Sequence, residues 1–195
     1  NGARCSLIPV GDKGADVEAA ENSGACALHI SPSHQYPTGA VMPADNRSRL
    51  IAWAERTGAY IIEDDYDSEF RLFGKPLQTM AGMNGERVIY LNTFSKTLAP
   101  SLRMGYMVLP PVLYARYRAL YGESANVVPL FEQKTLARML DGGYFERHVN
   151  RLKNYYRGVR ALLLEKLNAL DIKKQIIETG GGLHLTVRLP DFESD

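Results

Sequence analysis

Several features that would place this sequence of 195 residues in a specialised class of protein are scarce or absent. No apolar run approaches the roughly 20 residues that a membrane span needs. The start, NGARCSLIPV, lacks the basic and apolar regions of a signal peptide. There are only two cysteines, Cys5 and Cys26, without CxxC spacing, so we expect two reduced thiols buried in the core. Nothing in this segment indicates a membrane or export role, and we expect a cytoplasmic setting.

The sequence also lacks an excess of charge of either sign. Its formal net charge is +1, with 45% hydrophobic and 23% charged residues, which is typical of an ordinary globular protein. Nucleic acid is therefore not favoured as a direct partner of this segment. Basic residues do gather in ERHVNRLKNYYRGVR, but Glu146, Tyr155 and Tyr156 interrupt them, so we interpret this helix as a solvated or dimer surface.

The pattern of apolar residues predicts an α/β fold with a mainly parallel sheet. Short apolar or β-branched runs alternate with segments of helical period. The predicted strands are CSLIPV, ACALHI, AYIIED, RVIYLN and RMGYMVLP. Between two of them, PADNRSRLIAWAERTG predicts a helix that begins near Pro43 and stops at Gly58.

After Pro111 the sequence becomes helical, with a long helix from about residue 144 to 170. A final run, GGGLHLTVRLP, alternates apolar and polar residues as a half-buried strand does. We therefore predict two parts, a large-domain portion over residues 1–150 and, over residues 151–195, an interdomain helix with the start of a smaller domain. Strands without visible partners at both ends indicate a piece of a longer protein.

The first stretch that could carry chemistry is YIIEDDYDSEF, an apolar strand that ends in acidic residues. Ligands of parallel α/β sheets bind beyond the carboxyl ends of the strands, which makes this stretch a candidate site. A calcium loop fails, because Phe70 stands where the turn glycine should be and Pro76 where the bidentate glutamate should be. A solvated acidic loop stays open. The polar residues concerned are Glu63, Asp64, Asp65, Tyr66, Asp67 and Glu69.

The second stretch is YLNTFSKTLAPSLRMGY, in which Lys96 follows a strand by a short turn rich in hydroxyl groups. Hydroxyls and a planar guanidinium are suited to a phosphate dianion. Lys96 could be a further phosphate contact, a nucleophilic amine or a solvated surface residue. The candidate phosphate ligands are Thr93, Ser95, Ser101 and Arg103.

The two stretches together meet the demands of pyridoxal 5'-phosphate. This cofactor needs an amine for its aldehyde, a carboxylate for its ring nitrogen, a donor for its phenolic oxygen and ligands for its phosphate. A nucleotide P-loop is excluded, because the pattern GxxxxGK[ST] does not occur. A third stretch, HISPSHQYPTGAVMP, is either a rigid loop at the same edge of the sheet or a plain turn.

These motifs resemble the aminotransferase-like domain of fold-type I pyridoxal-phosphate proteins. More narrowly, SPSHQYPTG, IEDDYDSEF, TFSKTLAPSLRMGY and FEQKTLARMLDGGYFERHVNRLKNYYRGVR resemble the MocR subgroup of GntR-type transcription regulators. The resemblance runs from about Val10 to the end of the chain. It implies a three-layer α/β large domain, with a mainly parallel sheet flanked by helices, followed by the start of the small C-terminal domain.

The resemblance also implies roles for particular residues. Lys96 would hold the cofactor as an internal aldimine, Asp64 would bind the pyridine nitrogen, and Tyr66 would donate to the phenolic oxygen. Ordinary aminotransferases carry asparagine in an NPTG loop, whereas this chain has Tyr36, which favours the regulators. The cofactor-binding set implied by the resemblance is Lys96, Asp64, Tyr66, Thr93, Ser95 and Arg103, with Tyr36, His34 and Gln35 in the pocket wall.

For function, the resemblance implies the effector domain of a homodimeric regulator that senses an amine or amino acid. DNA would be bound by a winged helix outside this chain. The glycine-rich phosphate loop and the small-domain arginine of the family would also lie outside it, upstream and downstream. One alternative is a free-standing class I/II aminotransferase that uses the same residues. Another is a structural dimerisation domain without cofactor, in which loss of Lys96 has no effect.

Overall fold

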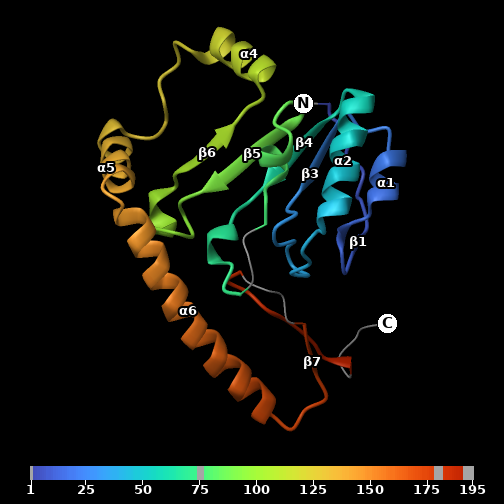
Figure 1. Ribbon diagram of the computed structural model, residues 1–195, viewed down its shortest axis with the longest axis vertical. Coiled ribbons are helices and arrows are strands. Elements are labelled where there is room, and N and C mark those ends of the chain that lie inside the picture. The colour runs from blue at the N-terminus through green and yellow to red at the C-terminus, as the bar shows by residue number, and fades with distance from the viewer. Residues whose placement is uncertain (1, 74–76, 178–181, 191–195) are drawn as a thin grey trace. The chain divides into compact units, whose positions relative to one another are not determined.

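The computed structural model describes residues 2–73, 77–177 and 182–190, and the chain divides into two compact units (Figure 1). One unit comprises Asn1–Tyr66 and Pro76–Glu123, and the other comprises Asp67–Lys75 and Ser124–Asp195. Every residue of the predicted cofactor-binding set belongs to the first unit, whereas Asp67 and Glu69 of the acidic stretch belong to the second. The division into domains at residue 150, predicted from the sequence, stays a prediction.

The first unit is built on a sheet of four strands in the order β3-β4-β5-β6 (Figure 1). The first three strands run parallel to one another, and β6 runs antiparallel to β5. This arrangement confirms the predicted α/β class with a mainly parallel sheet. The strands are β3 (Ala27–Ile30), β4 (Tyr60–Asp64), β5 (Val88–Thr93) and β6 (Gly105–Val108).

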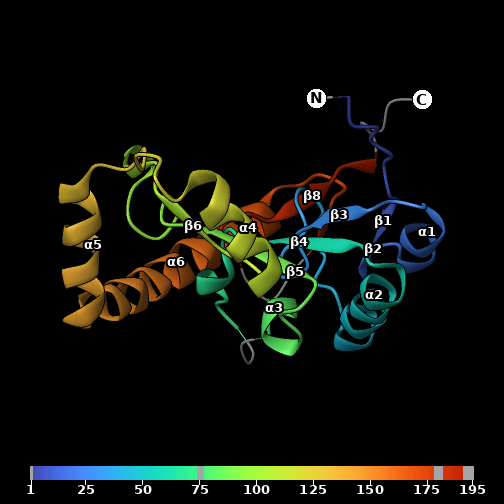
Figure 2. The same cartoon turned by 90° about the horizontal axis from the view of Figure 1, so that it is seen from above.

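Helices cover one face of this sheet. The helix α2 connects β3 to β4, and α3 lies between β4 and β5 in the chain; both are on the same side of the sheet (Figure 2). Leu50, Trp53 and Ala54 of α2 pack in one cluster with Ile61 of β4 and Val88 of β5. The helices of this unit are α1 (Val17–Asn22), α2 (Ala44–Thr57), α3 (Met80–Met83) and α4 (Pro111–Tyr121).

The beginning of the chain differs from the prediction. Only the last residue of the predicted strand CSLIPV, Val10, lies in a strand. That strand, β1 (Val10–Gly11), pairs with β2 (Gly14–Ala15) in a small hairpin. The prediction of buried cysteines is wrong, since Cys5 and Cys26 are both exposed. Cys5 lies in a segment without regular structure, and Cys26 precedes β3 at its entry to the sheet.

The second unit contains the predicted later helices and a two-stranded sheet. Its elements are η1 (Ser68–Phe70), α5 (Leu130–Asp141), α6 (Tyr144–Ala169), β7 (Gln175–Ile177) and β8 (Thr186–Arg188). Leu183 and Leu185, predicted within the last strand, precede β8. Phe70 packs edge-on against Tyr156 of α6, with ring centroids 5.5 Å apart. Within the three described ranges, no helix is long and apolar enough to cross a membrane.

Candidate functional site

The structure brings the predicted site segments to one edge of the four-stranded sheet. Because β3, β4 and β5 are parallel, they end at the same edge, and the antiparallel β6 begins there. Asp64 is the last residue of β4, Thr93 is the last residue of β5, and Arg103 lies just before β6. This edge, which we call the carboxyl edge, is where ligands of parallel α/β sheets bind.

Alternation along β4 separates the acidic residues that the sequence places side by side. Successive side chains of a strand point to opposite faces of the sheet. Ile61 and Glu63 are fully buried on the face covered by α2 and α3. Asp64 therefore points to the opposite face, which also carries His29 and Ile62 and which we call the site face.

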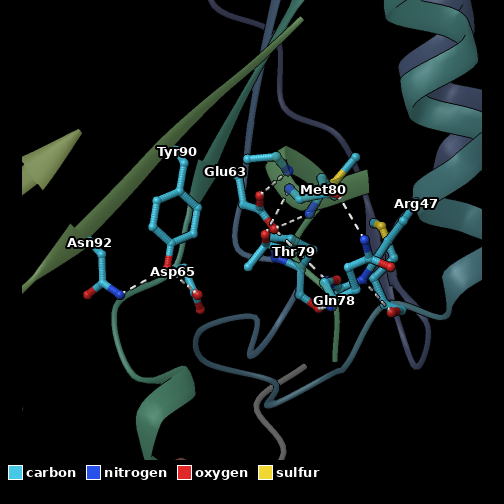
Figure 3. Close-up of polar contacts among 12 residues, drawn as sticks. Arg47, Glu63, Asp65, Gln78, Thr79, Met80, Tyr90 and Asn92 are labelled. Atoms are coloured by element: carbon cyan, nitrogen blue, oxygen red, sulfur yellow. Dashed lines mark hydrogen bonds and ion pairs between the residues drawn. The ribbon is translucent and has the colours of Figure 1, made fainter. Parts of the chain in front are cut away.

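Glu63 is held inside the fold, as Figure 3 shows. Its two carboxylate oxygens accept hydrogen bonds from the backbone N–H groups of Met80 (2.8 Å) and Ala81 (2.9 Å). Burial raises the pKa of Glu63, and these two bonds together with the charge of Arg47 counteract part of that rise. Glu63 thus anchors the start of α3 and is not available to a ligand at the carboxyl edge.

Arg47 of α2 is the buried cation next to Glu63, 3.9 Å from its carboxylate and 1% exposed (Figure 3). Its guanidinium donates to three backbone carbonyls, those of Pro32 (2.8 Å), Met42 (3.0 Å) and Gln78 (2.9 Å). Two of these carbonyls belong to the loop between β3 and α2. Arg47 therefore fixes the shape of the loop that contains SPSHQYPTG.

Asp65 is also committed to the fold. The hydroxyl of Tyr90 donates to its carboxylate at 2.8 Å, and the amide of Asn92 donates to that hydroxyl at 3.0 Å (Figure 3). Asp65 is 1% exposed. Burial, and then the charge and hydrogen bond of Asp65, raise the pKa of Tyr90 well above its usual value. The buried network keeps the chain after β4 in place beside β5.

Asp64 is the carboxylate of this stretch that remains partly open on the site face. Its side chain is 36% exposed, and its Oδ2 atom lies 3.3 Å from Nε2 of His29 on the neighbouring strand. No motif in the sequence points to this pairing of His29 with Asp64. Alternation places both residues on one face, but only the register of β3 against β4 brings them together.

Tyr66 connects the end of β4 to the loop after β3. Its hydroxyl donates to the backbone carbonyl of His34 at 2.8 Å, and its ring stacks on the ring of His34 with centroids 6.5 Å apart. Tyr36, in the same loop, is 70% exposed and precedes Pro37 through a cis peptide bond. The sheet edge thus holds both tyrosines, while their predicted contacts with a cofactor stay predictions.

The turn after β5 presents Lys96. Thr93 organises this turn, because its hydroxyl donates to the carbonyl of Met104 (3.2 Å) and accepts from the N–H of Ser95 (3.1 Å). Thr97 is fully buried, whereas Lys96 is exposed. Among the described residues, the amine of Lys96 makes no hydrogen bond or ion pair, so it is available to a ligand.

Arg103 completes the group in an unusual backbone conformation. Its backbone is in the left-handed region (φ 47°, ψ 32°). Within the described ranges, every other residue with a positive φ is a glycine. This conformation costs an L-residue roughly 1–2 kcal/mol, and such strain concentrates at functional sites. The close approach of β6 to β5 depends on Gly105, where a Cβ would lie 2.8 Å from the carbonyl oxygen of Asn92.

Comparison with known proteins supports the assignment of the fold and narrows the family. The model of the aminotransferase class I and II family matches residues 4–190. The uncharacterized HTH-type transcriptional regulator YhdI of Bacillus subtilis is 41% identical over 83% of this chain and 35% of its own length. The probable rhizopine catabolism regulatory protein MocR of Rhizobium meliloti is 38% identical over 80% of this chain and 32% of its own. The chain therefore spans about a third of the length of these curated relatives.

A solved structure shows the same fold. The kynurenine aminotransferase of Pyrococcus horikoshii, crystallised in complex with PMP, superposes with a TM-score of 0.83 at 31% identity. The match covers 95% of this chain and 49% of the aminotransferase. The two regulators match 83% and 80% of this chain and the enzyme matches 95%, and the higher identities are to the regulators.

Proposed function

This chain belongs to the aminotransferase class I and II family, and from that premise we propose that it is the pyridoxal-phosphate-binding effector domain of a GntR/MocR-type transcription regulator. The observation that carries the proposal is the identity of 41% and 38% to two regulators, YhdI and MocR. The whole protein would bind operator DNA through a segment outside this chain. It would act as a cytoplasmic homodimer, because dimers of helix-turn-helix proteins read two-fold symmetric sites.

The donor groups at the carboxyl edge fit pyridoxal 5'-phosphate. Lys96 supplies an exposed amine, Asp64 a partly open carboxylate and Arg103 a permanently charged guanidinium. Ser95 adds a hydroxyl that makes no hydrogen bond among the described residues. The hydroxyl proton of Thr93 already serves the turn, so we assign to Thr93 mainly the positioning of Ser95 and Lys96.

When bound, pyridoxal phosphate supplies an aldehyde that amines attack and a ring that draws electrons from the attached carbon. In our proposal Lys96 holds the aldehyde carbon, and Ser95 with Arg103 binds the phosphate. Asp64 accepts the N–H of the ring and keeps that proton in place, since a nearby carboxylate favours the charged form of the ring nitrogen. The hydroxyl of Tyr66 donates to the carbonyl of His34 in this structure and would turn its proton to the phenolic oxygen when the cofactor is bound, and Tyr36 is assigned to the wall of the pocket.

The proposed effector is an amine or amino acid that competes with Lys96 for the cofactor. Such a ligand changes DNA binding only if its affinity differs between conformations of the full-length dimer. In the full-length protein loaded with cofactor, we expect one member of a panel of amino acids and amines to change the affinity for the DNA flanking its own gene. The expected change is about fivefold or more.

This expectation is checked by fluorescence anisotropy of the labelled DNA, with and without pyridoxal phosphate. The Lys96→Ala protein is the matched control, because it would keep its DNA-binding segment and lose the response. If amines change the absorption spectrum of the bound cofactor while the affinity for DNA stays constant across the panel, the proposed effector function is wrong.

The alternative function is that of a free-standing aminotransferase, and the 31% identity to the kynurenine aminotransferase favours it. In that case Lys96, once displaced, acts as the general base that moves a proton at the substrate α-carbon. Repeated turnover of an amino acid with a 2-oxo acid, followed by chromatography of the products, would support the enzyme. A single turnover per bound cofactor agrees with the effector domain.

Asp64→Asn is expected to weaken cofactor binding roughly ten- to hundredfold, because a charge-assisted hydrogen bond contributes about 1.5–3 kcal/mol. The dissociation constant of pyridoxal phosphate, measured by fluorescence, checks this. Asp65→Asn is the matched control one residue along, since Asp65 contacts Tyr90 inside the fold. It should lower the thermal stability and leave the affinity of the folded protein unchanged. Equal losses of affinity in both variants would contradict the assignment of Asp64.

A further inference from the structure

His29 is a histidine whose ring contacts Asp64, the residue that we assign to the ring nitrogen of the cofactor. It lies on β3, opposite Ile62 in the register with β4, and Asp64 is two residues further along on the same face. The Nε2 atom of His29 is 3.3 Å from Oδ2 of Asp64. Among the described residues, neither side chain has another hydrogen-bond partner.

The pair is too exposed to serve mainly the stability of the fold. The side chain of His29 is 60% exposed and that of Asp64 is 36% exposed. Exposed pairs of this kind contribute little to folding. The buried carboxylates on either side, Glu63 and Asp65, carry the structural contacts of this stretch.

The contact has a directional consequence for Asp64. A carboxylate has two oxygens, and the hydrogen bond from His29 occupies Oδ2 and limits rotation of the group. The other oxygen, Oδ1, remains for a donor on the site face. Hydrogen bonds from neighbouring side chains are a general means of orienting a ligating group, as with the residues that orient metal ligands.

We propose that His29 is a positioning residue that orients Asp64 toward the protonated ring nitrogen of the bound pyridoxal phosphate. This inference rests on the proposed function of the carboxyl edge. It assigns to His29 no contact with substrate or cofactor. It predicts that His29 acts through the orientation of Asp64 alone.

The test uses the full-length protein loaded with pyridoxal phosphate whose ring nitrogen carries an NMR-active isotope. We expect His29→Leu to move the ring-nitrogen chemical shift toward that of the unprotonated ring and to raise the dissociation constant about tenfold, the loss of one hydrogen bond. His29→Gln should restore most of both, because its amide can donate from a similar position. The thermal melting temperature should change little in either variant.

Two further variants separate the possible results. Tyr60→Phe removes a polar group at the other end of β4 on the same face and should leave the chemical shift as in the original protein. Asp64→Asn should move it at least as far as His29→Leu. An unchanged shift in His29→Leu, together with a clear change in Asp64→Asn, overturns the role of His29 and leaves the site intact. No change in either variant, or no cofactor bound by the original protein, overturns the proposed site as well.

Discussion

Replacing Arg47 by methionine is expected to destabilise the protein by about 3–5 kcal/mol, as removal of one partner of a buried ion pair does. Arg47 is 1% exposed and donates to the carbonyls of Pro32, Met42 and Gln78. The substitution leaves these three acceptors and the carboxylate of Glu63 without their cation (Figure 3). Unfolding in urea, followed by circular dichroism, measures the effect.

The control for this prediction lies two residues along the same helix. Arg49 is half exposed and forms a single ion pair with Glu21 at 2.9 Å. Because exposed pairs contribute about 0–1 kcal/mol, Arg49→Met should change the stability by less than about a third of the effect of Arg47→Met. Similar losses in the two variants would show that Arg47 does not hold the loop after β3.

The effect of Arg47→Met should also depend on pH in a defined direction. Burial raises the pKa of Glu63 above the ordinary value of 4.5, and Arg47 counteracts the rise. Without Arg47 the folded-state pKa rises further, so folding favours the protonated carboxyl more strongly. The loss of stability should therefore be smallest below pH 4.5 and grow as the pH rises through the raised folded-state pKa.

Lys96→Ala is expected to abolish the cofactor that borohydride fixes to the protein, because it removes the only amine that we assign to the aldehyde. Lys96 is exposed, so the variant should fold as stably as the original protein. Lys96→Arg separates the amine from its charge. The guanidinium of Lys96→Arg keeps the positive charge, but it cannot deprotonate and act as a nucleophile. This variant should therefore lose the fixed cofactor as completely as Lys96→Ala.

The control for the Lys96 variants is Lys13→Ala, which removes an exposed lysine in the hairpin between β1 and β2. Its visible absorption with pyridoxal phosphate, and the amount of cofactor retained after reduction, should equal those of the original protein. If Lys96→Ala retained the full amount, a different anchoring lysine would replace our assignment. If the original protein itself retained no cofactor, the view of this chain as a structural dimerisation domain would replace it.

The fold was predictable from the sequence where local signals were strong. The helix α2 follows Pro43 and ends at Gly58, which is left-handed as expected of a helix stop. The bounds of β4 and β5 agree with the predicted strands AYIIED and RVIYLN to within one residue at each end. CSLIPV misled the prediction, because a short apolar run forms a strand only where a partner strand is available.

The site was predictable only in part. Motifs identified Asp64 and Lys96, and alternation along β4 could have shown that Glu63 faces the core and Asp64 the opposite side. The partners of these residues were not predictable. Arg47 donates to carbonyls both in the loop after β3 and in the segment before α3. His29 contacts Asp64 because β3 and β4 pair side by side, although 29 residues of loop and helix lie between these strands in the sequence.

The identity of the lysine that holds the cofactor tests the proposed site most directly. The measurement is to load the full-length protein with pyridoxal phosphate, reduce it with borohydride, digest it and locate the modified residue by mass spectrometry. The account predicts that the peptide containing Lys96 carries the cofactor. A label on another lysine, such as Lys13 or Lys75, would contradict it, because neither follows β5 in the chain.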